Sequence, residues 1–354
     1  MVKKNICFLV SSFRKGGSEK NIAFILNNLA RHNFSIDCIV IYDDKFEYDI
    51  HPDINFHFLK AKSFRVASLR IFKIIKNNNF DIVFSNMPYL NIANSLISII
   101  LRGKYEVICR ESILISKYLD NEVRFSFIWK FLLKIAYKRA NYIVAQCEEM
   151  KHDILNQFLI NENKVKVIGN PILISHDMKP LLKNSNQIRL LSIGRLTYQK
   201  GFDILIESIS FLNDLDVQLT IIGDGDLRSS LYLLINELNL VNKVSIINPV
   251  SNINQYYNKH DIFCTTSRYE GFPNVVLESL ASSLIVCSTP SVTGINEIKE
   301  HNQNSVFISQ TSESKSFSDL LRQIIFCKPE VADVNLAKWH PDVISSNYNS
   351  LFSE

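Results

Sequence analysis

Short apolar runs alternate with longer segments whose apolar residues recur at helical spacing, over almost the whole chain. The first run, Ile6–Val10, precedes a segment in which Ile22 and Leu26 fall on one helical face. The runs with strand character are Ile6–Val10, Cys38–Tyr42, Ile82–Ser85, Glu106–Cys109, Tyr142–Ala145, Val165–Ile168, Arg189–Ile193, Gln218–Ile222, Val244–Ile247, Asp261–Cys264, Leu284–Cys287 and Ser305–Ile308. Strands that alternate with helices in this way predict parallel sheets and an α/β fold.

The chain is long enough for two domains, because 354 residues exceed the usual size of a single core. The turn residues Gly169–Pro171 close the first half, and the polar stretch Lys179–Gln187 indicates a linker. A terminal helix is expected from Pro341. We therefore predict a first domain over residues 1–175, a second over residues 176–338 and a terminal segment over residues 339–354.

The composition is that of a globular protein, with 47% hydrophobic residues and a mean hydropathy of +0.04. No apolar run approaches the ~18 residues that span a bilayer. The run Ile6–Val10 is too short for a secretory signal and soon meets Arg14 and Lys15, so we expect a cytoplasmic protein. The seven cysteines are scattered, odd in number and without a C-x-x-C pair, which favours buried thiols over disulfides or zinc.

Charge is unevenly distributed between the two halves. Residues 1–175 carry 25 Lys+Arg and 16 Asp+Glu, a net charge of +9, whereas the remainder carries 14 and 19, a net charge of −5. In the first half, Phe64–Phe80 and Phe125–Ala140 mix cationic with apolar residues. Each segment fits a helix on an anionic membrane surface, and each also fits a domain helix with a solvated cationic face. A nucleic-acid partner is disfavoured, because the aromatic residues are not interleaved with a basic stripe.

Two glutamates surround the start of a predicted helix in the second half. Glu270 lies in the preceding loop, Pro273 takes the first helical position, and Glu278 lies in the second turn. A helix N-terminus favours phosphate, while carboxylates accept hydrogen bonds from the hydroxyls of a sugar or ribose. The pattern predicts a ligand that carries both groups. The alternative is that Glu270 is a loop charge and Glu278 an exposed helix residue.

Two further loops are candidates for ligand binding. Arg195 and Lys200 lie in a glycine-flanked loop after the strand Arg189–Ile193, where two cations can neutralise a pyrophosphate without a divalent metal. Solvation at the surface is the alternative for either cation. Gly16 and Gly17 follow the first strand, where they allow close approach to a ligand or simply form a tight turn. They are not part of a dinucleotide fingerprint, and Ser18 is expected to cap the next helix.

Three sequence strings carry a family resemblance: Glu-Gly-Phe-Pro-Asn-Val-Val-Leu-Glu from Glu270, Gly-Arg-x5-Gly from Gly194, and Gly-Gly-Ser-Glu from Gly16. Together they resemble the family-four retaining glycosyltransferases. The resemblance implies the GT-B fold, in which two Rossmann-like domains face each other across a cleft and a C-terminal helix returns to the first domain. It also implies transfer of a hexose or N-acetylhexosamine from a nucleotide diphosphate sugar, most often a UDP-sugar, to a glycan or polyprenyl-linked acceptor in bacterial surface polysaccharide synthesis.

The same resemblance assigns expected roles to single residues. Arg195 and Lys200 would bind the donor diphosphate, Glu278 the ribose and Glu270 the donor sugar. The loop at Gly16 and Gly17 would also contact the donor. The main chain around the helix start would hold sugar and phosphate, through Phe272, Pro273, Asn274 and Val275.

One expected residue is missing after the strand Glu106–Cys109. Many relatives have a histidine there, whereas this chain has Arg110-Glu111-Ser112. Arg110 or Glu111 is therefore a candidate contact for the sugar or acceptor, and a structural ion pair is the alternative.

Asp224-Gly225-Asp226 matches the D-x-D motif that chelates manganese in the GT-A fold, but it lies in a glycine-containing turn before a helix. We interpret it as turn and cap chemistry and expect no metal or other cofactor. Two other functions remain open: a sugar-nucleotide epimerase of the same fold, and a catalytically silent partner subunit that binds nucleotide sugar.

Overall fold

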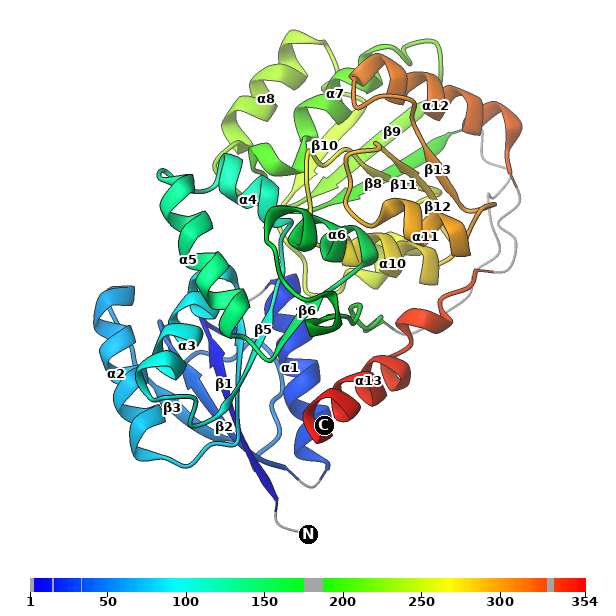
Figure 1. The fold of residues 1–354 in the computed structure, drawn as a ribbon. Helices are drawn as coiled ribbons and strands as arrows, with labels where there is room; N and C mark the ends of the chain where they lie inside the picture. Colours follow the sequence, from blue (N-terminus) through cyan, green and yellow to red (C-terminus); the bar gives the residue numbers. More distant parts are fainter. Residues whose placement is uncertain (1–2, 15, 33, 175–186, 330–333) are drawn as a thin grey trace. The chain divides into compact units, whose positions relative to one another are not determined.

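The chain forms two units, each built on one parallel sheet (Figure 1). The computed structural model describes residues 3–14, 16–32, 34–174, 187–329 and 334–354. The first unit comprises Met1–Pro171 and Trp339–Glu354, and the second comprises Ile172–Lys338. Each is a Rossmann-like α/β domain, which confirms the predicted fold class.

The sheet of the first unit has seven parallel strands in the order β3-β2-β1-β4-β5-β6-β7. The strands are β1 (Lys4–Val10), β2 (Phe34–Val40), β3 (Asn55–Phe58), β4 (Ile82–Asn86), β5 (Glu106–Arg110), β6 (Tyr142–Ala145) and β7 (Val165–Val167). The helices are α1 (Gly17–Ala30), α2 (Phe64–Asn77), α3 (Pro88–Ile100), α4 (Ile115–Asn121), α5 (Ser126–Arg139), α6 (Glu148–Gln157) and α13 (Pro341–Ser353), with the 3₁₀ turns η1 (Glu162–Lys164) and η3 (Ala337–Trp339). Because β1 lies between β2 and β4, the strand order reverses beside it, and ligand loops favour such a point.

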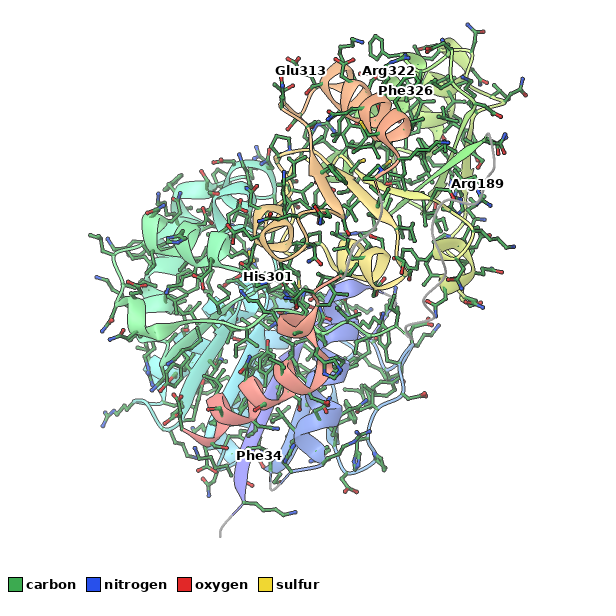
Figure 2. All side chains as sticks on the ribbon, turned by 90° about the vertical axis from the view of Figure 1, so that its right-hand side faces the viewer. Phe34, Arg189, His301, Glu313, Arg322 and Phe326 are labelled. Carbon is green, nitrogen blue, oxygen red and sulfur yellow. The ribbon has the colours of Figure 1, made fainter. Side chains whose placement is uncertain are left out.

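The C-terminal helix belongs to the core of the first unit. The Phe352 ring, from α13, lies 5.7 Å from the rings of both Phe8 and Phe84. It also lies 6.4 Å from Phe34, which Figure 2 shows beside this helix. The last five residues of β1 are buried, as expected for an interior parallel strand. The predicted return of the terminal helix to the first domain is therefore confirmed.

The sheet of the second unit has six parallel strands in the order β10-β9-β8-β11-β12-β13. The strands are β8 (Ile188–Ile193), β9 (Val217–Ile222), β10 (Val244–Ile247), β11 (Ile262–Thr265), β12 (Ile285–Ser288) and β13 (Val306–Ile308). The helices are α7 (Phe202–Ser210), α8 (Arg228–Glu237), α9 (Asn254–Tyr257), α10 (Asn274–Ala281), α11 (Ile295–His301) and α12 (Ser314–Cys327), with the 3₁₀ turn η2 (Tyr198–Lys200). The order reverses at β8, whose neighbours are β9 and β11.

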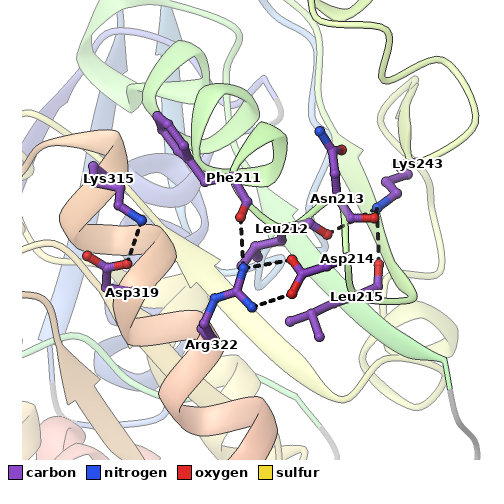
Figure 3. Close-up of polar contacts among 9 residues, drawn as sticks. All are labelled: Phe211, Leu212, Asn213, Asp214, Leu215, Lys243, Lys315, Asp319 and Arg322. Atoms are coloured by element: carbon purple, nitrogen blue, oxygen red, sulfur yellow. Dashed lines mark hydrogen bonds and ion pairs between the residues drawn. The ribbon is translucent and has the colours of Figure 1, made fainter.

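Charged side chains fix the turn that follows α7 (Figure 3). The guanidinium of Arg322, on α12, donates to both carboxylate oxygens of Asp214 at 2.6 and 2.7 Å and to the Phe211 carbonyl at 3.0 Å. These hydrogen bonds lower the pKa of Asp214 to about 2. The ammonium of Lys243 donates to three carbonyls of the same turn, those of Leu212, Asn213 and Leu215. The end of α7 is thus anchored on two sides.

Besides shifts of a single residue at strand ends, four local expectations differ from the structure. The edge strand β3 was not expected, because its half-exposed sequence lacks an apolar run. Strand β2 begins at Phe34, four residues before the predicted start, because polar Ser35 and Asp37 alternate with buried positions. Ser18 does not cap α1, which begins at Gly17; the Ser18 hydroxyl accepts a hydrogen bond from Asn86 at 2.9 Å instead. Pro273 is the N-cap of α10 rather than its first residue.

Two sequence expectations concern the whole chain. All seven cysteines are free thiols, and all except Cys327 are buried, as predicted. Within the described ranges, no helix is both long and apolar enough to cross a membrane. The stretch expected as a linker, Lys179–Gln187, lies outside the described residues except for its last one.

Candidate active site

The two predicted donor-binding loops of the second unit lie at the point where its strand order reverses. Strands β8 and β11 are hydrogen-bonded neighbours, with Ile262 opposite Leu190. Because the strands are parallel, the loops at their carboxyl ends emerge side by side. One loop carries Arg195 and Lys200 and the other carries Glu270. Open α/β sheets bind ligands at such a point.

Lys200 and Glu270 form the centre of this site. The ammonium nitrogen of Lys200 lies 2.5 Å from Oε1 of Glu270, and the Ser267 hydroxyl donates to the same oxygen at 2.6 Å. The Lys200 side chain is 18% exposed and the Glu270 side chain 8%. The sheet thus brings together a cation and a carboxylate that are 70 positions apart in the sequence.

A second set of contacts ties the two loops together. The Arg268 guanidinium binds both carboxylate oxygens of Asp203, at 2.9 and 2.5 Å, and lies 4.0 Å over the ring of Tyr198. Burial opposes the ionisation of Asp203, but the hydrogen bonds and charge of Arg268 outweigh it and lower the pKa. The Arg268 amide donates to the Gln199 carbonyl at 2.8 Å, and the Gln199 side chain donates to the Tyr269 carbonyl at 3.1 Å. Because Tyr198 and Gln199 before Lys200 and Asp203 after it all contact the Glu270 loop, these contacts hold Lys200 opposite Glu270.

Glycine is required where the first loop ends. Gly201 has φ +62°, in the left-handed region that glycine tolerates best, and a Cβ there would lie 2.1 Å from the Thr266 carbonyl oxygen. The Thr266 hydroxyl donates to the Gly201 carbonyl at 2.8 Å. Close approach of the two loops thus depends on this glycine.

Arg195 differs from Lys200 in its surroundings. Its side chain is exposed at the beginning of the loop, whereas that of Lys200 is mostly covered and paired with Glu270. Of these two cations, Arg195 is therefore the more accessible to an anion in this structure. Lys200 reaches one only by sharing its charge between Glu270 and the ligand.

Helix α10 carries the second glutamate of the predicted pair. The Tyr257 hydroxyl donates to Oε2 of Glu278 at 3.0 Å. Burial, and then the charge of Glu278, raise the pKa of Tyr257, so this phenol stays a donor. The buried tyrosine therefore orients the carboxylate that is expected to bind ribose.

The backbone before α10 is partly engaged already. The Asn274 amide donates to the Phe272 carbonyl at 3.0 Å, and the Val276 amide donates to the Pro273 carbonyl at 2.9 Å. Proline itself has no amide proton. Of the main-chain groups at Phe272, Pro273, Asn274 and Val275, the Asn274 amide would have to exchange a partner within the loop to bind a ligand.

In the first unit, Gly16 and Gly17 lie after β1, beside the reversal of strand order. Gly16 is the N-cap of α1, and its amide donates to the Tyr48 hydroxyl at 2.8 Å. A Cβ at Gly16 would lie 2.2 Å from a carboxylate oxygen of Glu19. Because that oxygen is the end of a flexible side chain and Gly16 has an extended φ of −175°, the structure does not require glycine here, and contact of this loop with a donor stays a prediction.

Arg110 and Glu111 are fully buried. Arg110 donates to three neutral oxygens, those of Tyr348 at 3.1 Å, Asn86 at 2.8 Å and Asn170 at 2.7 Å. These contacts link the ends of β4 and β5 to the chain segment leaving the first unit and to α13. A role of Arg110 in binding a sugar would require this network to open.

Glu111 faces a separate buried group. Its Oε1 accepts hydrogen bonds from Asn91 and from the Tyr137 hydroxyl, each at 2.6 Å. Burial raises the pKa of Glu111 to about 7 despite these hydrogen bonds. The ion pair considered as an alternative is not formed between Arg110 and Glu111. Their contact with sugar or acceptor stays a prediction.

The Asp224-Gly225-Asp226 segment forms a turn packed against the Arg195 loop. The Leu196 amide donates to the Asp224 carbonyl at 2.9 Å, and a Cβ at Gly225 would lie 2.6 Å from the Leu196 carbonyl oxygen. The Arg228 guanidinium binds the Asp224 carboxylate at 3.2 Å and the Gly223 carbonyl at 2.9 Å. Over the described ranges, no group of three or more His, Cys, Asp or Glu residues could hold a metal ion.

Three supporting residues were not predicted from the sequence: Tyr257, Ser267 and Arg268. Ser267 and Arg268 lie three and two positions before Glu270, and this proximity was the signal that could have identified them. Tyr257 lies 21 positions from Glu278, so only the tertiary fold brings its hydroxyl to the carboxylate.

Two Rossmann-like domains with a site at the strand reversal of the second define the GT-B class of fold. Comparison with known families agrees: the model described as Glycosyltransferase Family 4 matches residues 15–175, and the model described as Glycosyl transferases group 1 matches residues 174–335. The chain belongs to these glycosyltransferases, with a family 4 first half and a group 1 second half.

Curated relatives match over nearly their full length. N-acetylgalactosamine-N,N'-diacetylbacillosaminyl-diphospho-undecaprenol 4-alpha-N-acetylgalactosaminyltransferase of Campylobacter jejuni is 28% identical over 93% of this chain and 92% of that protein. The amylovoran biosynthesis glycosyltransferase AmsD of Erwinia amylovora is 24% identical over 96% of each chain. This protein is thus similar to bacterial glycosyltransferases that build polysaccharides and lipid-linked glycans.

Solved structures support the fold. The apo lipopolysaccharide outer core galactosyltransferase WaaB has a TM-score of 0.77 at 17% identity, covering 99% of each chain. Anabaena Alr3699/HepE in complex with UDP and glucose has a TM-score of 0.80 at 18% identity, also covering 99% of each chain.

Proposed function

We propose that this protein transfers a hexose or N-acetylhexosamine from a UDP-sugar to a polyprenyl-diphosphate-linked glycan, with retention of anomeric configuration. The observation that carries the proposal is the Lys200–Glu270 pair beside exposed Arg195, with Glu278 on the adjoining helix. The Campylobacter jejuni relative supports the choice of acceptor, because its name describes an undecaprenol diphosphate substrate. HepE, solved with UDP and glucose, supports the choice of donor.

Each group has a distinct task in this proposal. Glu278, oriented by Tyr257, accepts hydrogen bonds from the ribose hydroxyls. Glu270 accepts hydrogen bonds from hydroxyls of the donor sugar. Arg195 and Lys200 bind the diphosphate, and the dipole of α10 adds a favourable field at its N-terminus. A donor sugar near Glu270 and a diphosphate near Lys200 would place the bond that breaks beside both side chains.

The chemistry follows from charge. As the anomeric carbon–oxygen bond breaks, its electron pair moves to the leaving diphosphate, and the cations Arg195 and Lys200 stabilise that charge. The acceptor hydroxyl attacks the anomeric carbon from the same face. Its proton passes to an oxygen of the departing phosphate. A cationic loop provides this stabilisation without a metal ion, so we propose a metal-independent reaction.

Lys200 has a second task in this scheme. Its ion pair with Glu270 holds a nearly buried carboxylate in place before the donor binds. When the diphosphate arrives, the same ammonium can donate to both groups, because it carries three protons.

The test of the proposed function begins with ligand binding. A panel of nucleotide sugars is screened for thermal stabilisation, because a ligand that binds the native state raises the melting temperature. The stabilising donor is then incubated with a polyprenyl-diphosphate glycan. We expect a UDP-sugar to stabilise the protein and its sugar to appear on the lipid. Stabilisation without transfer to any acceptor would support a silent partner subunit, and isomerised free nucleotide sugar would support an epimerase; the named relatives favour neither.

We also propose that the protein acts at the cytoplasmic face of the cell membrane, because a polyprenyl-linked acceptor is embedded there. This location has a direct measurement in cell fractionation. A protein that stays wholly in the soluble fraction at low salt would argue for a soluble acceptor.

A further inference from the structure

The outward face of helix α5 exposes more large apolar side chains than a solvated helix needs. Phe127 and Phe131 are 71% and 63% exposed, Ile128 is 43% exposed, and Phe125, just before the helix, is 53% exposed. The opposite face is buried and consists of Leu133, Ala136 and Tyr137. Contiguous exposed apolar side chains of this kind mark interaction surfaces.

Cations continue the same face. Phe127, Phe131, Lys134 and Lys138 are spaced by four, three and four residues, so they form one stripe along the helix. Lys130 lies beside this stripe and donates to the Gln157 side chain at 2.7 Å. The segment from Arg124 to Arg139 contains five cations and no carboxylate. The stripe is therefore apolar over its first turns and cationic over its last.

The apolar end lies at the functional edge of the first unit. Helix α5 leads from the carboxyl end of β5, through α4, back to the start of β6 (Figure 1). A helix that makes this connection runs antiparallel to the strands, so its first turns lie near their carboxyl ends. The loop of Gly16 and Gly17 lies at the same edge, where ligand loops of such sheets gather.

We propose that α5 is the surface with which this protein docks on an anionic lipid bilayer. Phe127 and Phe131 enter the interface between headgroups and acyl chains, and Lys130, Lys134 and Lys138 contact anionic headgroups. The inference rests on the proposed function, because a polyprenyl-linked acceptor must be reached at a membrane. It adds the side chains that make the contact and the orientation of the first unit on the lipid.

Charge argues for lipid rather than for a second copy of the chain. Two copies that met through this face would bring Lys130, Lys134 and Lys138 of one copy against the same three lysines of the other, with no carboxylate in the segment to compensate. An anionic bilayer complements both parts of the stripe at once. Phenylalanine and lysine on one helix face are the side chains that interfacial helices use.

Helix α2 offers a matched control. It exposes Leu69 at 68% and Val66 at 45%, beside Arg65, whereas its two phenylalanines, Phe64 and Phe72, are only partly exposed. The sequence marked this segment and α5 equally as membrane candidates. The strongly exposed phenylalanines of α5, Phe127 and Phe131, separate the two helices.

Vesicle co-sedimentation tests the proposal. The full chain is mixed with vesicles of phosphatidylglycerol and phosphatidylcholine, or of phosphatidylcholine alone. We expect Phe127→Ser/Phe131→Ser to weaken binding at least about tenfold. Lys130→Gln and Lys134→Gln should each weaken binding to the anionic vesicles about fivefold, with little effect on neutral ones. The control, Leu69→Ser, should bind within about twofold of wild type, because no burial is lost.

Each other outcome overturns the proposal. Wild-type vesicle binding by Phe127→Ser/Phe131→Ser would exclude α5, and an equal loss in Leu69→Ser would assign the contact to α2. A different result would assign this face to a protein interface: the wild type is a dimer, Phe127→Ser/Phe131→Ser is a monomer, and both bind vesicles equally. All variants change exposed side chains, and equal melting temperatures verify their folding.

Different results would refute the docking surface and the proposed function. Sugar transfer to a water-soluble acceptor analogue does not require a bilayer, so the phenylalanine variants should retain it. Loss of vesicle binding with transfer to the soluble analogue intact is the expected pattern. Normal vesicle binding by a wild-type protein that transfers no sugar would refute the function and leave the docking surface standing.

Discussion

Lys200→Ala removes the cation that pairs with Glu270, and its effect can be worked out from the structure. Two unit charges 2.5 Å apart attract by about 7 kcal/mol at an effective dielectric constant of about 20, and the loss of hydration offsets most of this attraction. Removing one partner of a buried pair costs about 3–5 kcal/mol, because the other charge stays behind. Since Ser267 still donates to Glu270 and Lys200 is 18% exposed, we expect the lower end, about 3 kcal/mol of unfolding free energy.

A double-mutant cycle isolates the pair. Urea unfolding is measured for wild type, Lys200→Ala, Glu270→Ala and the double variant. We expect a coupling energy of about 1–3 kcal/mol, so the double variant should lose less stability than the two single variants combined. Turnover should fall by roughly 10²–10³ in Lys200→Ala, as for loss of one donor aimed at a developing charge. Additive stability changes with near-normal turnover would refute both the pairing and the role at the leaving group.

Three further outcomes are expected. Tyr257→Phe should weaken donor affinity about fivefold to tenfold with turnover little changed, because Glu278 loses one hydrogen bond of about 1 kcal/mol; calorimetric titration with the donor nucleotide measures this, and a pure turnover defect would contradict it. The pKa of Glu111 is raised to about 7 in the folded state, so the folded protein binds the proton more tightly and stability falls as pH rises from about 4.5 to about 7. Glu111→Gln should remove up to about 3 kcal/mol of that decrease, as followed by unfolding across this range; an unchanged pH profile would argue against a buried neutral acid. Sugar transfer should survive strong chelation, and Asp224→Asn and Asp226→Asn should reduce turnover only slightly. Complete loss of transfer that manganese or magnesium restores would instead support Asp224-Gly225-Asp226 as a metal site.

Much of the fold is predictable because parallel strands buried on both faces leave continuous apolar runs. Strands β6 and β10 begin and end where the runs predict. The edge strand β3 has no such run, since only part of it is covered. The prediction that Ser18 caps α1 was wrong, because its hydroxyl accepts a hydrogen bond from Asn86 instead. Asn86 is 68 positions away, so no local sequence rule reveals this contact.

The candidate site shows the same division. Glycines, a proline and the helical period of apolar residues mark two loops and a helix as candidate ligand-binding segments. These features pointed to Glu270, Glu278, Arg195 and Lys200 as candidates. Their contacts are set by tertiary structure: Lys200 meets Glu270 only because β8 and β11 are neighbours.

Burial was the least predictable property. Arg110 is a strand-end cation in the sequence, yet it is fully covered and binds three neutral oxygens. Two of those oxygens come from distant parts of the chain, Asn170 and Tyr348. Arg110, a charged residue that the sequence pattern would place at the surface, thus connects the β5 end to the last residues of the first unit's two chain segments.

The central claim is sugar transfer with retention at the Lys200–Glu270 site. The most direct measurement is a nuclear magnetic resonance spectrum of the product formed from an α-linked UDP-sugar and a polyprenyl-diphosphate glycan, recorded for wild type and Glu270→Ala. The proposed reaction predicts an α-linked product from wild type and strongly reduced turnover in the variant. A β-linked product, or equal turnover in the two proteins, would contradict it.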